Sequence, residues 1–287
     1  MLILLPPSET KRPGGGGLSL SETGLGASRL SFPTQNEQRR GLLDALTLLS
    51  RDERESARVL KLGPKQLGET QVNAAVWDSP TMPAIARFTG VLYDAIEVET
   101  LDADARAFIA AHVLIQSALF GLIRAEDEIP AYRLSFDSRV PGIGALKNFW
   151  APSSAAVLTT LLDGGPESNE SAGLVLDLRS EGYAALAPLP DHPDAYFVRA
   201  VGRAANGELR QLNHFNKKGK GVFVQKLAST FPAWWRSQSG ANSTVRVELR
   251  NVLGWAQAHD VELSALSDGR TLQLVINEAD YPPLTAR

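Results

Sequence analysis

The sequence predicts a mixed α/β (α+β) fold, in which helices surround a central sheet within one compact domain. Two apolar runs, Met1–Leu5 and Gly173–Leu178, have the length and composition of fully buried strands. Segments with helical periodicity lie between and after them, and 287 residues is near the upper limit for one hydrophobic core. The polar segment 164–171 is too short to be a domain linker. We therefore expect residues 1–287 to form a single domain with the two runs as neighbouring central strands.

Helical patterns dominate the chain after the first strand. Leucines recur at positions 42, 43, 46 and 49, which predicts a helix over residues 37–50. Further helices are predicted over Asp52–Leu62, Lys65–Trp77 and Asp102–His112, with Asp102 as the N-cap of the last. Residues 84–96 fit either a strand or a helix, and the apolar run 114–122 fits a passage from helix to strand.

After the second apolar run, strands and helices continue to alternate. Asn206-Gly207 is typical of a hairpin turn, which predicts a strand pair over 196–201 and 209–215. Helices are expected over residues 222–235 and 245–258. A second hairpin is expected near the end, over 261–263 and 272–276.

The composition excludes several kinds of site. The chain has no cysteine, so disulfides, thiolate metal sites and cysteine nucleophiles are excluded. The four histidines show no metal-ligand spacing, and there is neither a P-loop nor a Rossmann glycine pattern, so we expect no metal and no cofactor. A net charge of −3 argues against a general polycation. Without a signal-peptide pattern or a membrane-length apolar run, we expect a cytoplasmic protein.

Two glycine-containing turns resemble the hairpin of a helix-hairpin-helix. In that motif, backbone N–H groups at the start of the second helix point at a DNA phosphate. The segment Leu60–Leu67 lies between two predicted helices and contains Lys61, Gly63 and Lys65; an ordinary helix–helix corner with solvated lysines explains it equally well. The segment Val140–Ala145 has a closer turn sequence, but no helical stripe precedes it. We interpret it as a turn leading into residues 146–150.

A basic cluster lies at the predicted junction of a strand and a helix. Lys217, Lys218 and Lys220 fall within four residues, among glycines that let the backbone approach an anion. A solvated basic turn is the alternative, since most charge runs are solvated faces. The position between two buried elements favours a phosphate site.

Asp177 ends the second apolar strand, and Glu181 and Tyr183 follow it, where open α/β sheets hold ligands. Arg124 and Arg133 flank the acidic segment 126–128. These side chains could line a polar cleft, or they could be helix caps and structural ion pairs.

Five segments in order resemble the peroxide-stress protein YaaA family of bacteria. They are the opening Met1–Lys11, Ser117–Arg124 with Asp127 and Tyr132–Leu134, the pair Phe149-Trp150, Leu176–Tyr183, and Phe215–Gly221. The resemblance implies one compact domain of unusual α/β topology with a basic cleft and a helix-hairpin-helix, which corresponds to about residues 52–77. It also implies DNA binding and a role in limiting damage during hydrogen peroxide stress.

The chain departs from the family pattern at chemically important positions. Glu9 stands where the family opening has a lysine, with Lys11 two places on. Gly182 stands in place of a glutamate, although Glu181 is adjacent. If the family lysine and glutamate serve a reaction, this chain uses Lys11 and Glu181 instead or has altered chemistry.

The leading hypothesis is a cytosolic DNA-binding protein of the peroxide stress response that favours DNA structure over sequence. The residues expected to bind nucleic acid are Lys217, Lys218, Lys220, Lys61, Gly63, Lys65 and Arg133. The alternative is an enzyme with a small nucleotide-like ligand in a cleft around Asp177, Glu181 and Lys217. Its catalytic candidates are Asp177, Glu181, Tyr183 and Arg124. A protein-interaction or iron-handling factor is a third hypothesis, for which the sequence shows no ligand cluster.

Overall fold

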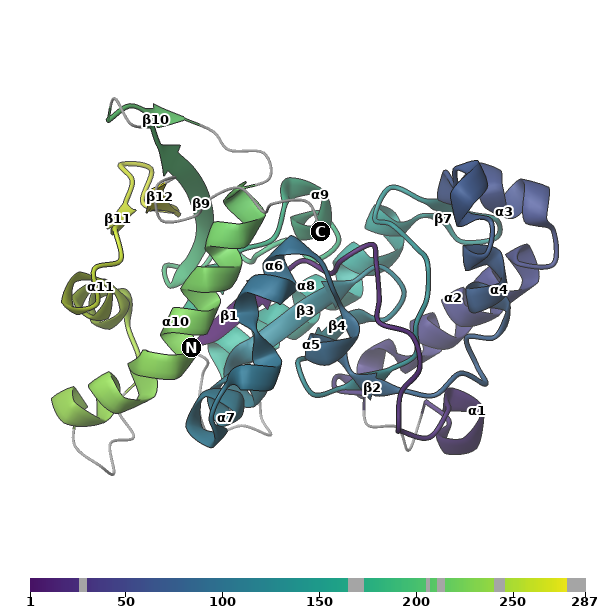
Figure 1. Ribbon diagram of the computed structural model, residues 1–287, viewed down its shortest axis with the longest axis horizontal. Helices are drawn as coiled ribbons and strands as arrows, with labels where there is room; N and C mark the ends of the chain where they lie inside the picture. The colour runs from purple at the N-terminus through teal and green to yellow at the C-terminus, as the bar shows by residue number, and fades with distance from the viewer. Residues whose placement is uncertain (26–29, 165–172, 205–206, 211–214, 240–245, 278–287) are drawn as a thin grey trace.

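A central mixed sheet organises the molecule (Figure 1). The computed structural model describes residues 1–25, 30–164, 173–204, 207–210, 215–239 and 246–277. Within these ranges the sheet has eight strands in the order β11-β12-β9-β8-β1-β3-β4, and β10 pairs with β9. The strands are β1 Leu2–Leu5, β3 Val113–Ser117, β4 Gly121–Arg124, β8 Val175–Asp177, β9 Ala195–Arg203, β10 Leu209–Arg210, β11 Leu263–Ala265 and β12 Thr271–Asn277. Two small ribbons are formed by β2 Met82–Pro83 with β5 Glu128–Ile129, and by β6 Arg139–Val140 with β7 Gly144–Ala145.

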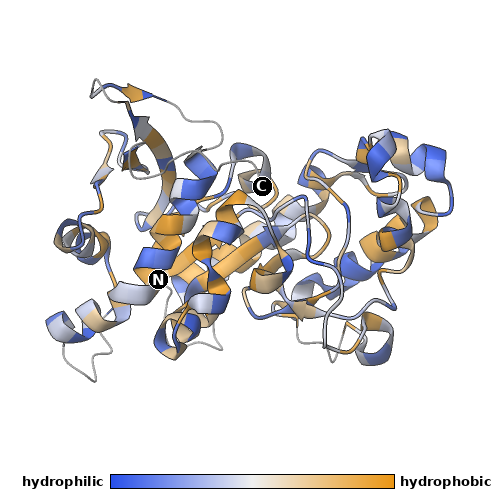
Figure 2. Ribbon diagram, in the orientation of Figure 1, coloured by the Kyte–Doolittle hydropathy of each residue, from blue (hydrophilic) through white to orange (hydrophobic). Residues whose placement is uncertain are grey.

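The two predicted apolar strands are neighbours at the centre of the sheet, as expected. Strand β1 pairs in parallel with β8 on one side, where Ile3 lies opposite Leu176, and with β3 on the other, where Ile3 lies opposite Val113. Ile3 and Leu5 face one apolar cluster, whereas Leu2 and Leu4 face the other. This alternation shows that both faces of the strand are covered, and Figure 2 shows the hydrophobic character of the central strands. The prediction of fully buried strands is confirmed.

Helices cover both faces of the sheet. They are α1 Leu20–Thr23, α2 Asn36–Leu49, α3 Glu53–Leu60, α4 Glu69–Ala74, α5 Ala84–Arg87, α6 Val91–Ile96, α7 Ala103–His112, α8 Leu146–Asp163, α9 Glu181–Ala184, α10 Phe215–Ser239 and α11 Leu249–Ala258, with 3₁₀ turns η1 Pro33–Gln35, η2 Pro64–Gln66 and η3 Val98–Thr100. Helices α6, α7 and α10 pack together on one face, and α8 supplies Leu158 and Leu162 to the other. Figure 1 shows α2, α3 and α4 gathered at one end of the molecule, on the right of the view. No helix among the described residues is long and apolar enough to cross a membrane.

Most predicted helices are confirmed, and the ambiguous segments are now resolved. Asp102 caps α7 by accepting a hydrogen bond from the Ala105 N–H at 2.8 Å. Residues 84–96 form two short helices, and the run 114–122 forms the tight antiparallel pair β3–β4. Gly121 has a φ of +66°, and a Cβ there would lie 2.7 Å from the Trp150 ring. A glycine is therefore needed where the chain turns into β4.

The predicted strand over 209–215 is confirmed at 209–210, is wrong at Phe215, and lies outside the described residues at 211–214. Pairing between β9 and β10 joins Leu209 to Arg203 and Arg210 to Gly202. Phe215 then opens α10 instead of ending a strand. Gly202 and Arg203 pair with β10 on one edge of β9 and with β12 on the other, so the hairpin is limited to the end of β9. Asn206 of the predicted turn lies outside the described residues.

The order of the strands along the chain indicates where in the sheet a ligand would bind. Strands β3, β1, β8, β9 and β12 run parallel. In this parallel set, β1 is followed along the chain by β3, which lies on one side of β1. The next strand of the set, β8, lies on the other side of β1, so the direction of the strand order reverses there. In open α/β sheets, ligands bind outside the carboxyl ends of the strands at such a switch point. The loops that follow β1 and β8 are therefore the expected position of a ligand.

His112, at the opposite edge of the sheet, provides a pH test of the fold. Its Nδ1 lies 2.8 Å from the Met1 carbonyl oxygen, and burial lowers the pKa of His112 to about 4. The unfolded chain takes up a proton near pH 6.5, so it binds more protons than the folded chain between pH 6.5 and 4. We expect this group to remove about 1–2 kcal/mol of stability as the pH falls through that window. Urea unfolding at pH 7 and pH 4.5 should show a smaller loss in His112→Gln; an equal loss would contradict the assignment.

Candidate functional site

The loop after β1 is held firmly at the carboxyl edge of the sheet. The hydroxyl of Tyr93 donates to the Pro6 carbonyl oxygen at 2.7 Å, and the Thr89 N–H donates to the Ser8 hydroxyl at 3.1 Å. Lys11 forms a β-bridge with Phe88. Helix α6 and the segment that precedes it thus fix the backbone that carries the Glu9 and Lys11 side chains.

Lys11 presents its amine to aromatic rings and a neutral acceptor. The side chain is half-buried, and its Nζ lies 4.0 Å from the centre of the Tyr132 ring and 5.7 Å from that of Phe88. The amine donates to the Glu9 carbonyl oxygen at 3.1 Å. Burial, and then the positive charge of Arg133, lower the pKa of Lys11 to about 7, against the opposite pull of Glu69 and Glu9. The neutral form of the Lys11 amine is therefore far more accessible near neutral pH than that of an ordinary surface lysine.

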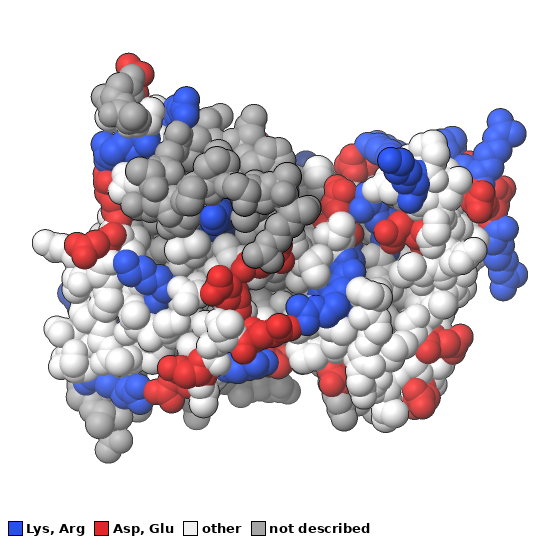
Figure 3. All heavy atoms as spheres, viewed as in Figure 1, with Lys and Arg blue, Asp and Glu red and all other residues white. Residues whose placement is uncertain are grey.

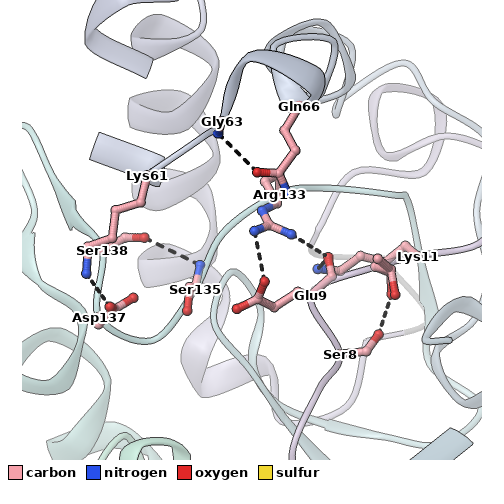
Figure 4. Close-up of polar contacts among 11 residues, drawn as sticks. Ser8, Glu9, Lys11, Lys61, Gly63, Gln66, Arg133, Ser135, Asp137 and Ser138 are labelled. Carbon is pink, nitrogen blue, oxygen red and sulfur yellow. Dashed lines mark hydrogen bonds and ion pairs between the residues drawn. The ribbon is translucent and has the colours of Figure 1, made fainter. Parts of the chain in front are cut away.

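Arg133 and Glu9 form the charged side of this site (Figure 4). Arg133 Nη2 lies 2.9 Å from Glu9 Oε2, with the Arg133 side chain 9% exposed and that of Glu9 62% exposed. The backbone of Arg133 is fixed by the buried Asn73 of α4, which accepts from its N–H at 2.7 Å and donates to its carbonyl oxygen at 2.8 Å. Helix α4, from the predicted hairpin segment, therefore supports this site. We call Glu9, Lys11, Tyr132 and Arg133 the Lys11 cluster.

Two tyrosines form neutral walls around the cluster. Ser117, the last residue of β3, accepts from the N–H groups of Leu119 and Phe120, and its Oγ lies 2.7 Å from the Tyr132 hydroxyl oxygen. Burial raises the pKa of Tyr132 well above its ordinary value and that of Tyr183 to about 12. The Tyr183 ring packs on Phe136 with 5.1 Å between centres. Both phenols remain protonated at physiological pH, and their rings exclude water.

Asp177 is not available as a catalytic group. Its carboxylate accepts from Arg179 Nε at 2.8 Å, from Nη2 at 2.6 Å and from the backbone N–H at 3.0 Å. Asp177 is 1% exposed and Arg179 is fully buried. The cleft expected around Asp177, Glu181 and Lys217 is therefore not centred on Asp177, because its neighbour two residues on already holds the carboxylate. The sequence interpretation missed Arg179.

The lysine cluster divides between surface and interior. Lys217 is exposed and Lys218 is half-buried, both in the first turn of α10. Lys220 is only 6% exposed; it donates to the Leu178 carbonyl oxygen at 2.9 Å, and burial lowers its pKa to about 8. The expectation that all three present exposed charges is wrong for Lys220, because the helix periodicity turns that position toward β8 and β9.

The hairpin segment keeps its exposed turn but not its second long helix. Helix α3 ends at Leu60, and Pro64 and Lys65 of the turn are exposed. The predicted helix Lys65–Trp77 is broken into the 3₁₀ turn η2 and the six-residue α4. Gly68 lies between them, and glycine is a weak helix former. The Gly63 N–H donates to the Gln66 side chain at 3.1 Å (Figure 4).

The remaining candidates lie at separate places. Lys61 forms an ion pair with Asp137 and is exposed. Glu181 is exposed at the start of α9. Arg124 lies opposite Leu114 near the amino end of β3 and donates to the Ala111 carbonyl oxygen at 3.2 Å. It therefore lies toward the edge of the sheet away from the Lys11 cluster, and in the strand order β8-β1-β3-β4 it is three strands from Asp177.

Gly182, which departs from the family pattern, has a steric explanation. A Cβ at this position would lie inside contact distance of the Phe136 ring, which covers α9. Tyr183 also packs on Phe136. A glutamate at position 182 would require this aromatic contact to move.

Comparisons with known proteins show the family of this chain. The family model described as peroxide stress protein YaaA matches residues 1–231. This chain belongs to that family. A UPF0246 protein of Corynebacterium efficiens is 38% identical over 230 residues, covering 80% of this chain and 86% of the relative. A UPF0246 protein of Streptomyces coelicolor is 40% identical over 232 residues, covering 80% and 84% respectively. The family match includes the Lys11 cluster and ends within α10, before α11, β11 and β12.

Proposed function

We propose that this family member is a cytoplasmic protein that binds DNA during peroxide stress, holding phosphates with the exposed Lys217 and the half-buried Lys218. The observation that carries the proposal is the start of α10. This 25-residue helix opens with Lys217 and Lys218 and has no acidic residue in its first turn. Cations at the positive end of a helix are unfavourable, by about 0.3–1 kcal/mol each. Such an unfavourable placement of cations at the surface is typical of a functional site. A bound phosphate would offset the repulsion between the lysines and the positive end of the helix.

The exposed turn at Gly63 offers a second contact. Lys65 is exposed beside it, and the family name provides the peroxide context. The Gly63 N–H is held by the flexible Gln66 side chain rather than by backbone, so a rotation of that side chain frees it for a phosphate oxygen. Lys61 would exchange Asp137 for DNA in the same step.

The charge distribution sets the expected mode of binding. Figure 3 shows acidic side chains interspersed with basic ones, and no unbroken basic stripe crosses the described residues on this face. With a net charge of −3, affinity must come from a few local contacts. Phosphate contacts position the protein without reading bases, so binding should depend on DNA structure more than on sequence.

Variants of the lysine cluster test this interface. Lys217→Ala and Lys218→Ala should each weaken duplex binding similarly across sequences, and each should reduce the slope of log K against log salt by about 0.9. Lys220→Met is the matched control, because the buried amine contacts Leu178 rather than solvent. Fluorescence anisotropy at several salt concentrations measures all four proteins. Equal slopes in the wild type and Lys217→Ala, or a large change in Lys220→Met, would reject the interface.

A specific observation also favours the enzyme hypothesis, at a different place from the one expected. The Lys11 cluster joins a half-buried amine, a guanidinium, a carboxylate and a phenol at the switch point of the sheet. Tyr183 and Arg133 belong to this region, whereas Asp177 and Arg124 do not. This combination supports chemistry on a ligand at the Lys11 amine.

A further inference from the structure

Lys11 differs from an ordinary surface lysine in its partners. The Glu9 carboxylate is taken by Arg133 at 2.9 Å, so the Lys11 amine meets the neutral Glu9 carbonyl oxygen and two aromatic rings instead. The β-bridge with Phe88 fixes the backbone from which the side chain rises. The amine is thus held against aromatic rings and beside a second cation. Desolvation and a neighbouring cation are the two features that keep a lysine amine neutral and nucleophilic.

We propose that Lys11 is an amine nucleophile that forms an imine with the ring-opened aldehyde of an abasic deoxyribose in DNA. The Nζ lone pair adds to the C1′ carbonyl carbon, and loss of one water gives the protonated imine. Glu9 then accepts the C2′ proton, and the electron pair of that bond expels the 3′ phosphate as the C3′–O bond breaks. Hydrolysis of the imine returns the free amine. The water released when the imine forms balances the water consumed when it is hydrolysed, and the reaction needs no oxidant or reductant.

The choice of aldehyde rests on the proposed DNA-binding function. A half-buried amine packed on two aromatic rings is open only to a small group, and an abasic sugar has no base to block its rotation out of the duplex. The Glu9 side chain is 62% exposed, so its carboxylate is accessible to a ligand at the cluster. Arg133 adds positive charge near the flanking phosphates. An intact nucleotide offers neither the aldehyde nor the small size.

Reductive trapping tests the imine directly. Wild-type protein is incubated with a duplex containing one abasic site and sodium cyanoborohydride, and the products are separated on a denaturing gel. We expect a covalent protein–DNA product with the wild type and at least a tenfold loss in Lys11→Met and Lys11→Arg. Lys147→Met is the matched control, since Lys147 is an exposed lysine of α8 outside the cluster. Urea unfolding verifies that Lys11→Met is folded, and it should be at least as stable as the wild type at pH 7.

The pH dependence of trapping distinguishes a reactive amine from a structural one. The rate should rise through about pH 7 as Lys11 loses its proton. Arg133, Glu69 and Glu9 are the charged groups that act on this amine. Arg133→Met should move the midpoint upward because a like charge is removed, and Glu69→Gln should move it downward because an attractive charge is removed. A purely structural role for Lys11 would produce neither shift.

The outcomes separate this inference from the proposed function. Binding of an undamaged duplex is measured on the same samples by anisotropy. A wild type that binds the undamaged duplex but forms no trapped product overturns the Lys11 chemistry and leaves DNA binding intact. Trapping that persists in Lys11→Met also overturns it, because another amine is then responsible. Trapping that requires Lys11 and follows the predicted pH shifts supports it.

Discussion

Replacing Asp177 with alanine is expected to lower the free energy of unfolding by about 3–5 kcal/mol. The carboxylate is the partner of a fully buried guanidinium, and its removal leaves Arg179 with the Ala187 carbonyl oxygen at 2.7 Å. It also removes the negative charge that favours protonation of the buried Lys220. An uncompensated buried charge is among the most destabilising changes available to a protein. Urea unfolding at pH 7 measures the loss.

A double replacement distinguishes a structural role from a catalytic one. Asp177→Leu combined with Arg179→Met removes both charges and retains apolar volume, a change that is often nearly neutral for buried pairs. We expect the double variant to recover much of the stability lost in Asp177→Ala and to bind duplex DNA like the wild type. A stable double variant without DNA binding would show that the pair takes part in function, contrary to the geometry.

Gly221→Ala is expected to destabilise the fold by about 3 kcal/mol. A Cβ at this position would collide with the Leu92 backbone carbonyl and lie 2.9 Å from the Ala95 Cβ, where α10 crosses α6. Backbone cannot rotate away as a side chain can, so the helices would have to separate. Their contact covers one face of the central sheet. Chemical denaturation measures the change.

The matched control is Gly41→Ala, in the exposed interior of α2. A Cβ there meets nothing within 4 Å. Since alanine is the stronger helix former, this variant should be more stable than the wild type by about 0.5–1 kcal/mol. If the two variants change stability in the same direction, the close approach of α10 and α6 is wrong.

The sequence predicts the layers of this fold well because they follow local patterns. Continuous apolar runs identify β1 and β8, and the leucine stripe at 42, 43, 46 and 49 identifies α2. Failures occur where tertiary packing overrides local preference. Phe215 is predicted as the end of a strand, but it begins α10, the long helix that packs on α6 and α7.

The site is less predictable because its contacts join distant residues. Arg133 and Glu9 are 124 positions apart, and Asn73 and Arg133 are 60 apart. The available signal was the unusual pair Glu9 and Lys11 directly after the first strand, at the carboxyl end of a central parallel strand. Nothing in the local sequence indicates that the Lys220 side chain points inward or that Arg179 forms a buried ion pair with the Asp177 carboxylate. Both depend on which way α10 and the turn after β8 face.

Duplex binding by the wild-type protein, measured by fluorescence anisotropy from low to physiological salt, tests the central claim most directly. The account predicts measurable binding to duplexes of unrelated sequence at low salt, with log K falling linearly as log salt rises. Four lysine contacts at about 0.9 each imply a shallow slope, of roughly three to four for the residues proposed here. No measurable duplex binding at the lowest salt concentration would contradict DNA binding by this chain.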